Sequence, residues 1–210
     1  MRKICLRIAL AAVVILASTA PLGQGIERPQ WRKGDTWTYK SLELANSAFQ
    51  GTFEGREVFS VIDVLPDGYD VAIRRLNSDG SEGEVWHGRN SLNANPITRA
   101  SADGSWAENT WLRWPYEVGK QWSIASKQKD GTSFQRDTSI TAWEDINVPA
   151  GHFRALRIDT EFAKGRYVRE ETWWYAPEVK RYVRFEARSR IGPTYSLEHT
   201  VAELVAFSLH

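Results

Sequence analysis

The sequence predicts an all-β fold with little helix, built as a single curved antiparallel sheet in the form of a half-barrel or open barrel. Three observations support this prediction. Turns that contain glycine recur along the chain, the segments between them are rich in β-branched and aromatic residues, and several segments alternate apolar with polar positions. Such residues suit the pleated surface of a strand, and alternation marks a strand with one covered face.

Residues 1–24 have the pattern of a signal peptide. Arg2, Lys3 and Arg7 precede an apolar run at 8–17, and small residues follow it. A basic region, an apolar region and small residues in this order are typical of an export signal. The apolar run is shorter than the roughly 20 residues of a transmembrane helix. We therefore expect a protein of the periplasm or the extracellular space, which contacts the membrane only through the signal segment if that segment stays uncleaved.

Without the signal segment the charge balance changes sign. The segment holds three of the 27 Lys and Arg residues and no acidic residue, so residues 25–210 contain 24 basic and 26 acidic residues. This balance does not favour nucleic acid as a partner. The single cysteine, Cys5, also lies in the signal segment, so we expect no disulfide beyond it. The length of 25–210 predicts one domain with its own core.

Glycine turns divide residues 25–210 into the expected strands. Turns are predicted where Gly follows Asp, because both residues tolerate the backbone of a tight turn, and at Lys164-Gly165. The segment 88–118 is expected to form a short helix or an irregular excursion, because Asn, Ser, Pro and Gly interrupt any period there. The expected strands are 36–44, 53–65, 69–77, 83–87, 120–128, 133–146, 153–163, 166–175, 180–189 and 194–208.

The predicted hairpin 153–175 has two plausible registers. A two-residue loop at Lys164-Gly165 pairs Phe162 with Tyr167. One face then holds Leu156, Ile158, Phe162, Tyr167, Arg169, Glu171, Trp173 and Tyr175. A three-residue loop places Val168, Thr172 and Trp174 on that face instead, because a slip of one residue exchanges the two faces of a strand. The sequence leaves both registers open.

Aromatic residues are the candidates for a binding surface. All ten Trp residues follow the signal segment, and the general expectation is that they fill the core and cover strand edges. However, segment 111–116 does not have a strand pattern, and Trp173 and Trp174 must face opposite sides of a sheet. The concave side of a curved sheet can hold a ligand between aromatic walls. The predicted ligand-binding residues are Trp111, Trp114, Tyr167, Trp173, Trp174 and Tyr175.

The segment from Arg154 to Arg190 is basic. It contains ten Lys or Arg residues and six acidic residues, with aromatic residues among them. This composition fits the solvated outer face of several strands with cross-strand ion pairs. Alternatively, it fits contact with an anionic component of the cell envelope.

No motif for catalysis or metal binding is present in the sequence. His87, His152 and His199 are far apart, and none has a second His or Cys at ligand spacing. The motifs H-E-x-x-H and G-x-S-x-G and a phosphate-binding glycine loop are also missing. We therefore expect a protein that is not an enzyme and that uses no cofactor and no metal. An enzyme would need dispersed carboxylates, such as Asp159 and Glu161, to converge in one cleft.

Three segments resemble an uncharacterised group of bacterial exported domains. The group has segments like P-L-x-V-G-K-x-W, V-P-A-G-x-F and Y-W-Y-A-P-x-V-G-x-V, and this chain has similar ones at Trp114–Trp122, Val148–Leu156 and Glu171–Val179. The resemblance covers residues 114–188. It implies a curved antiparallel sheet similar to the half-barrels of periplasmic lipoprotein carriers, and it supplies no catalytic residue. This chain differs at Lys180-Arg181, where the group prefers Gly.

The sequence thus predicts an exported, non-enzymatic protein of the cell envelope. Its Trp-rich curved sheet is expected to bind an apolar or amphiphilic ligand, such as a lipid, an acyl chain or a glycan. The alternative is a protein-interaction or assembly module, which would dock an envelope protein through a strand edge or an exposed aromatic patch.

Overall fold

A computed structural model describes residues 25–45, 52–77, 79–99, 106–127, 133–193 and 195–210. The predicted signal peptide at 1–24 and the turns expected at 102–104 and 129–131 lie outside these residues. All regular secondary structure in the described ranges is β-strand. No described segment forms a helix with the length and apolar character needed to cross a membrane.

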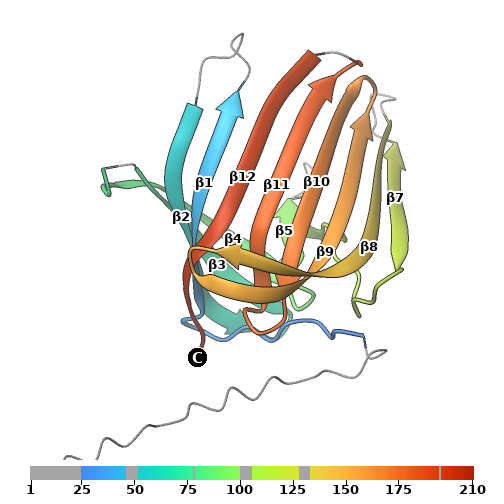
Figure 1. Cartoon of the computed structure of the whole chain (residues 1–210). Helices are drawn as coiled ribbons and strands as arrows, with labels where there is room; N and C mark the ends of the chain where they lie inside the picture. The colour runs from blue at the N-terminus through green and yellow to red at the C-terminus, as the bar shows by residue number, and fades with distance from the viewer. Residues whose placement is uncertain (1–24, 46–51, 78, 100–105, 128–132, 194) are drawn as a thin grey trace, which may run out of the picture.

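The strands form one antiparallel sheet of twelve strands, which is strongly curved (Figure 1). The strand order is β6-β5-β4-β3-β2-β1-β12-β11-β10-β9-β8-β7, so the first strand pairs with the last one in the middle of the sheet. The described strands β6 and β7 form the two edges and do not pair with each other, so the sheet stays open. These features confirm the predicted fold class.

The strand bounds agree closely with the predicted ones. The expectation of a short helix or irregular excursion at 88–118 was partly wrong, because β4 continues to Ser91 and two short strands without a readable alternation follow, β5 and the edge strand β6. The strands are β1 Thr36–Ala45, β2 Thr52–Leu65, β3 Gly68–Leu76, β4 Glu82–Ser91, β5 Pro96–Arg99, β6 Trp106–Glu108, β7 Gln121–Lys127, β8 Ser133–Val148, β9 Gly151–Lys164, β10 Tyr167–Ala176, β11 Arg181–Ile191 and β12 Tyr195–Ser208.

The β9–β10 hairpin turns at Gly165-Arg166, one residue later than the predicted Lys164-Gly165 loop. Arg169 therefore lies opposite Phe162, and the predicted pairing of Phe162 with Tyr167 was wrong. Gly165 has a φ of 59°, a conformation that glycine adopts at low cost. The observed register is shifted by two residues from the one predicted for a Lys164-Gly165 loop. Because side chains alternate between the two faces, a shift of two leaves every residue on its predicted face. Trp173 pairs with Ile158, and Tyr175 pairs with Leu156.

The β8–β9 hairpin covers the outer face of the sheet. Its two strands are 16 and 14 residues long, and their shared end bends across the neighbouring strands (Figure 1). At the tip, the backbone N–H of Ala150 donates to the carbonyl of Leu204 on β12 (3.0 Å), and the ring of Phe153 lies 6.1 Å from that of Phe207. The motif Val148-Pro149-Ala150-Gly151 is thus the turn that lets the sheet cover its own outer face.

Aromatic side chains near the N-terminal end hold the turn between β10 and β11. Trp31 Nε1 donates to the carbonyl of Lys180 (3.1 Å), and Trp37 Nε1 donates to that of Val179 (2.7 Å). Tyr39 Oη donates to the carbonyl of Tyr182 (2.8 Å). Trp31, Trp37 and Tyr39 are all buried. These bonds satisfy carbonyls of the turn and of the start of β11, and they join segments 142 to 149 residues apart in sequence.

Asp35 is a fully buried acid at the start of β1. Its carboxylate accepts hydrogen bonds from the backbone N–H of Arg32 (2.9 Å) and of His210 (2.8 Å). The ammonium of Lys180 lies 3.6 Å from the same carboxylate. One side chain therefore ties together the N-terminal segment, the C-terminal end and the β10–β11 turn.

Replacing Asp35 should strongly destabilise the fold. We expect Asp35→Ala to lower the free energy of unfolding by about 2–4 kcal/mol, because it leaves two backbone N–H groups and the Lys180 ammonium without their buried acceptor. Urea denaturation followed by Trp fluorescence measures this change. The control is Asp63→Ala, which removes a more exposed ion pair with Lys33 and should cost less than about 1 kcal/mol. Equal losses in the two variants would contradict the role given to Asp35.

Candidate functional site

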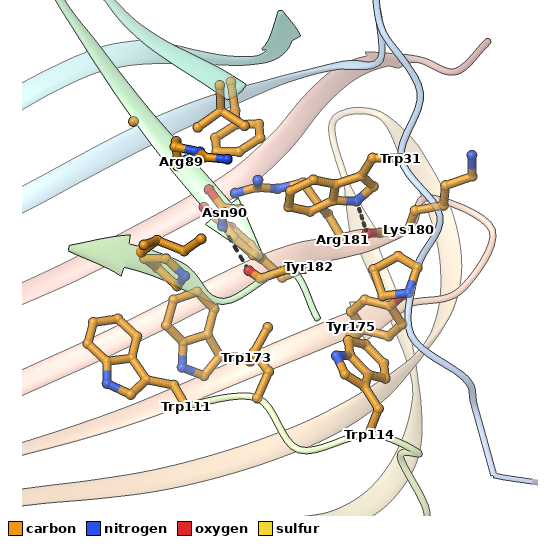
Figure 2. Close-up of a pocket in the computed structure, with 18 of the residues that line it drawn as sticks. Trp31, Arg89, Asn90, Trp111, Trp114, Trp173, Tyr175, Lys180, Arg181 and Tyr182 are labelled. Carbon is orange, nitrogen blue, oxygen red and sulfur yellow. Dashed lines mark hydrogen bonds between the residues drawn. The ribbon is translucent and has the colours of Figure 1, made fainter. Parts of the chain in front are cut away.

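The concave face of the sheet borders a cavity of about 900 Å³ (Figure 2). This volume lies within the range of roughly 300–1,000 Å³ that is typical of small-molecule sites. One wall comes from β2 to β4, and it includes Phe59, Val71 and Ile73. The opposite wall comes from β9 to β11, with Ile158, Trp173, Tyr175 and Tyr182.

The irregular segment 109–117, which follows β6, closes one side of the cavity. Trp111, Leu112, Trp114 and Tyr116 from this segment all line it. Trp114 stacks on Tyr116 with ring centroids 3.8 Å apart. Leu112 packs against both of the hydrophobic clusters of the protein, one around Trp31 and the other around Tyr116. The segment therefore joins the two halves of the curved sheet.

Backbone contacts hold this segment in place. The side-chain amide of Asn95 acts as a strand partner for Leu112: its Nδ2 donates to the Leu112 carbonyl (3.0 Å), and its Oδ1 accepts from the Leu112 N–H (2.7 Å). Tyr116 exchanges two backbone hydrogen bonds of 2.8 Å with Ile26. Because Asn95 is buried, its two bonds with Leu112 are shielded from competition by water.

Four of the six predicted binding residues line the cavity. Trp111, Trp114, Trp173 and Tyr175 do so, although they come from two separate segments of the chain. Tyr167 does not, because it lies at the far end of β10, where its ring packs 6.2 Å from that of Phe162. Trp174 does not either, because alternation along β10 turns it to the outer face.

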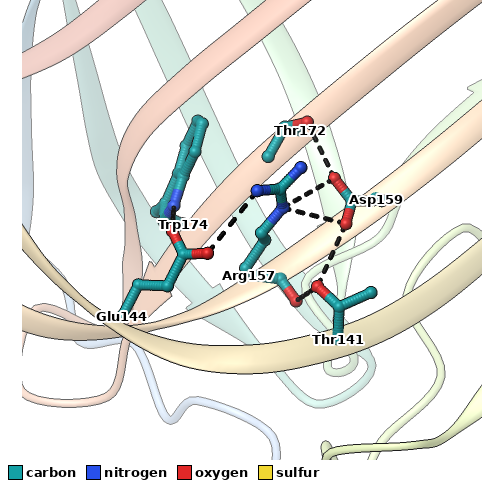
Figure 3. Close-up of polar contacts among 6 residues, drawn as sticks. All are labelled: Thr141, Glu144, Arg157, Asp159, Thr172 and Trp174. Carbon is teal, nitrogen blue, oxygen red and sulfur yellow. Dashed lines mark hydrogen bonds and ion pairs between the residues drawn. The ribbon is translucent and has the colours of Figure 1, made fainter.

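Trp174 belongs to a polar network under the β8–β9 hairpin (Figure 3). Its Nε1 donates to Glu144 (2.7 Å). Arg157 pairs through Nε with both carboxylate oxygens of Asp159, at 3.0 and 2.9 Å. Thr141 (3.0 Å) and Thr172 (2.8 Å) also donate to Asp159. Asp159 is one of the two acids that an enzymatic function would require in a shared cleft. Its carboxylate accepts four hydrogen bonds from neighbouring side chains.

The sequence prediction missed the charged residues of the cavity. The cavity lining includes four cationic side chains, those of Arg89, Arg136, Lys180 and Arg181. It also includes one acidic side chain, that of Asp70. Lys180 and Arg181 occupy the turn at which the resembling group prefers Gly, and this difference was the only signal for them. Lys180 adopts a φ of 60°, so a residue with a side chain keeps the backbone conformation of the expected glycine.

Three buried tyrosines at or near the cavity, Tyr39, Tyr116 and Tyr175, are neutral. Burial raises the pKa of Tyr39 and of Tyr175 well above the ordinary value near 10. Burial also raises the pKa of Tyr116, and the neighbouring Tyr175 adds to this effect. Their hydroxyl groups can therefore donate hydrogen bonds, but they supply no negative charge to the nearby cations. The described residues include no group of three or more His, Cys, Asp or Glu side chains arranged to hold a metal ion.

No protein-family model and no curated protein sequence matches this chain. Three solved structures are similar to it. A predicted lipoprotein from Parabacteroides distasonis is 14% identical with a TM-score of 0.47, over 88% of this chain and 100% of that one. A predicted exported protein with a YmcC-like fold from Bacteroides fragilis is 13% identical with a TM-score of 0.44, over 88% and 100%. The hypothetical lipoprotein YmcC from Escherichia coli is 11% identical with a TM-score of 0.37, over 87% and 90%.

Similarity at this level supports no inference about function. The proposed likeness to periplasmic lipoprotein carriers stays a prediction, and so does the assignment of the aromatic residues as ligand contacts.

The Asn95 contact should control the mobility of segment 109–117. We expect Asn95→Ala to speed up tryptic cleavage after the exposed Arg113 severalfold, because the Leu112 backbone loses both of its side-chain partners. Mass spectrometry of timed digests measures the rate. The control is Asn147→Ala at the exposed tip of the β8–β9 hairpin, which should leave this cleavage unchanged. An unaltered rate in Asn95→Ala, with an unaltered circular dichroism spectrum, would contradict this role.

Proposed function

We propose that the protein is an exported, non-enzymatic protein of the cell envelope that holds an apolar or amphiphilic ligand in the cavity on its concave face. The ligand is a lipid, an acyl chain or a glycan. The observation that supports this proposal is the cavity itself, a space of about 900 Å³ between aromatic and aliphatic walls. Protein interiors are normally packed to high density, so a space of this size in a single domain favours a ligand.

The exposure of the lining supports entry of a ligand from solvent. Ile62 and Trp111 both line the cavity, and they are 46% and 41% exposed. Most of the other lining residues are partly or fully buried. An apolar ligand that covers Ile62 and Trp111 would remove apolar surface from water, at a gain of about 25 cal/mol per Å².

The engagement of the acids favours a non-enzymatic role. Asp70 pairs with Arg89 (3.5 Å) at the cavity. Glu171, next to the cavity wall, pairs with Arg136 (2.6 Å) and Arg169 (2.8 Å). Carboxylates that are engaged by cations in this way are not free to contact a substrate. The buried tyrosines are neutral, so they do not act as bases.

A second candidate function, docking of an envelope protein, is favoured by a different part of the sheet. The β3–β4 hairpin extends beyond the other strands (Figure 1), and on it Val85 and Trp86 are 44% and 40% exposed. Exposed apolar side chains on a projecting hairpin are a feature of protein interaction sites. The guanidinium of Arg75 lies 5.2 Å from the ring of Trp86, so part of this ring is already covered.

A neutral probe tests the cavity as a binding site. Because the probe 1-N-phenylnaphthylamine fluoresces strongly only in apolar surroundings, we expect its emission to rise on titration with the protein and to fall on addition of a competing lipid. The protein is also expressed with its export signal, purified and extracted with organic solvent. Mass spectrometry of the extract then tests for a ligand that co-purifies with the protein. A parallel titration with chitotetraose tests the glycan class. No response to the probe, lipid or glycan would overturn the proposal.

Filling the cavity should abolish binding. Gly88 on β4 lines the cavity, and the nearest atom to a Cβ added there is Val71 Cγ2 at 3.8 Å, so Gly88→Phe places a ring in the cavity without a backbone clash. We expect the affinity for the neutral probe to fall by about tenfold or more. The matched control is Glu84→Phe, on the same strand but outside the cavity lining. Equal affinities in the two variants would contradict binding at this site.

A further inference from the structure

We propose that the ligand is anionic, and that the guanidinium of Arg181 binds its acidic head group, a carboxylate or a phosphate, at one end of the cavity. This inference rests on the proposed function, and it names the chemical class of the ligand. It begins from the cationic side chains of the cavity wall, because these outnumber the acidic ones there.

Three of the four cavity cations already have a carboxylate partner. Arg89 contacts Asp67 (2.8 Å) and Asp70 (3.5 Å). Arg136 contacts Glu171, and Lys180 contacts Asp35. No carboxylate among the described residues forms an ion pair with Arg181. Among the described cationic residues that line the cavity, Arg181 is thus the one without a carboxylate partner.

Aromatic rings surround Arg181 where an acid would be expected. The guanidinium carbon lies 3.7 Å from the ring centroid of Phe59, and 5.1 to 5.8 Å from those of Tyr182, Trp37, Trp31 and Tyr39. Ring faces attract a cation, but they accept no strong hydrogen bond. Nε of Arg181 donates to Tyr39 Oη (3.3 Å). Because burial raises the pKa of Tyr39, its hydroxyl is neutral and does not neutralise the positive charge.

The local backbone holds Arg181 at this position. Arg181 opens β11 directly after the turn in which Lys180 has a φ of 60°, a conformation that disfavours residues other than glycine. The carbonyls of Val179, Lys180 and Tyr182 are bound by Trp37, Trp31 and Tyr39. Figure 2 shows Arg181 beside Trp31, and Lys180 next to it at the edge of the site. The turn therefore presents a cation on a rigid support.

An anion at this position would change the energy of the site. The partly buried Arg181 guanidinium, packed among rings without a counter-ion, loses solvation, and an anionic head group would supply the missing partner with charge-assisted hydrogen bonds. The aromatic and aliphatic walls would then contact the apolar part of the same ligand. A fatty acid and a phosphate monoester lipid both have this combination of groups.

A matched pair of ligands tests the head group on the unaltered protein. Bromine quenches Trp emission on contact, so 9,10-dibromostearic acid and its methyl ester both report binding, and they differ only in charge. At pH 7.5 we expect the acid to bind at least about tenfold more tightly than the ester. Lysophosphatidic acid, as competitor of the brominated acid, distinguishes a phosphate head group from a carboxylate. Displacement by inorganic phosphate alone would support an anion site that needs no chain.

Variants test the assignment to Arg181. Arg181→Gln should bring the affinities for acid and ester close together, whereas Arg181→Lys should keep most of the preference because it keeps the charge. The control is Arg89→Gln, a cavity cation with carboxylate partners, which should keep the preference unchanged. Circular dichroism and the neutral probe confirm that each variant folds. If Arg181→Gln does not fold, Arg181→Met, which also removes the charge but keeps a long side chain among the rings, takes its place, and the same loss of preference is expected.

The outcomes separate this inference from the proposed function. Equal binding of acid and ester to the unaltered protein would overturn the anionic head group, but it would leave the cavity as a binding site. A preference for the acid that persists in Arg181→Gln would overturn the assignment to Arg181. Failure of the ester, the acid, chitotetraose and the neutral probe alike would overturn the proposed function itself.

Discussion

The turn between β10 and β11 depends on hydrogen bonds from the opposite end of the chain, and much of the structure depends on this turn. Trp31, Trp37 and Tyr39 bind its carbonyls across 142 to 149 residues of sequence. Backbone carbonyls that are buried without partners are costly, so the indole and phenol groups set where the turn lies. The same aromatic rings surround Arg181. One set of contacts thus holds the turn in place and positions Arg181 at one end of the cavity.

The sheet uses its two faces differently. The β8–β9 hairpin covers part of the outer face, where Trp174 donates to Glu144 and the backbone N–H of Ala150 donates to the carbonyl of Leu204. The concave face is covered only in part, by segments 25–31 and 109–117. A sheet normally buries an apolar face against a second layer of structure. Here the second layer is thin and irregular, and it leaves the cavity between itself and the strands.

Charge is unevenly matched around the cavity. Arg89, Arg136 and Lys180 each lie near an acid, so their charges are largely compensated within the protein. Arg181 has aromatic rings in place of an acid. A protein interior stabilises an isolated cation poorly, even with ring faces around it. Both features of the cavity, its apolar walls and its cationic end, are therefore complementary to an amphiphile with an acidic head.

The local pattern of the sequence was sufficient to predict where the strands lie and which residues of a strand share one face. Alternation and glycine turns predicted ten strands close to their observed bounds, and the adjacent Trp173 and Trp174 had to face opposite sides. Four of the six predicted aromatic residues line the cavity, because the irregular segment 111–116 and the parity of β10 are both visible in the sequence. Tertiary structure decided what the sequence left open: the Gly165-Arg166 turn, the face to which Trp174 points, and the position of Arg181 among residues of β1 and β2. The physical reason is that side-chain period and turn chemistry act over a few residues. The environment of Trp174 comes from Glu144, 30 residues away, and that of Arg181 comes from rings more than one hundred residues away.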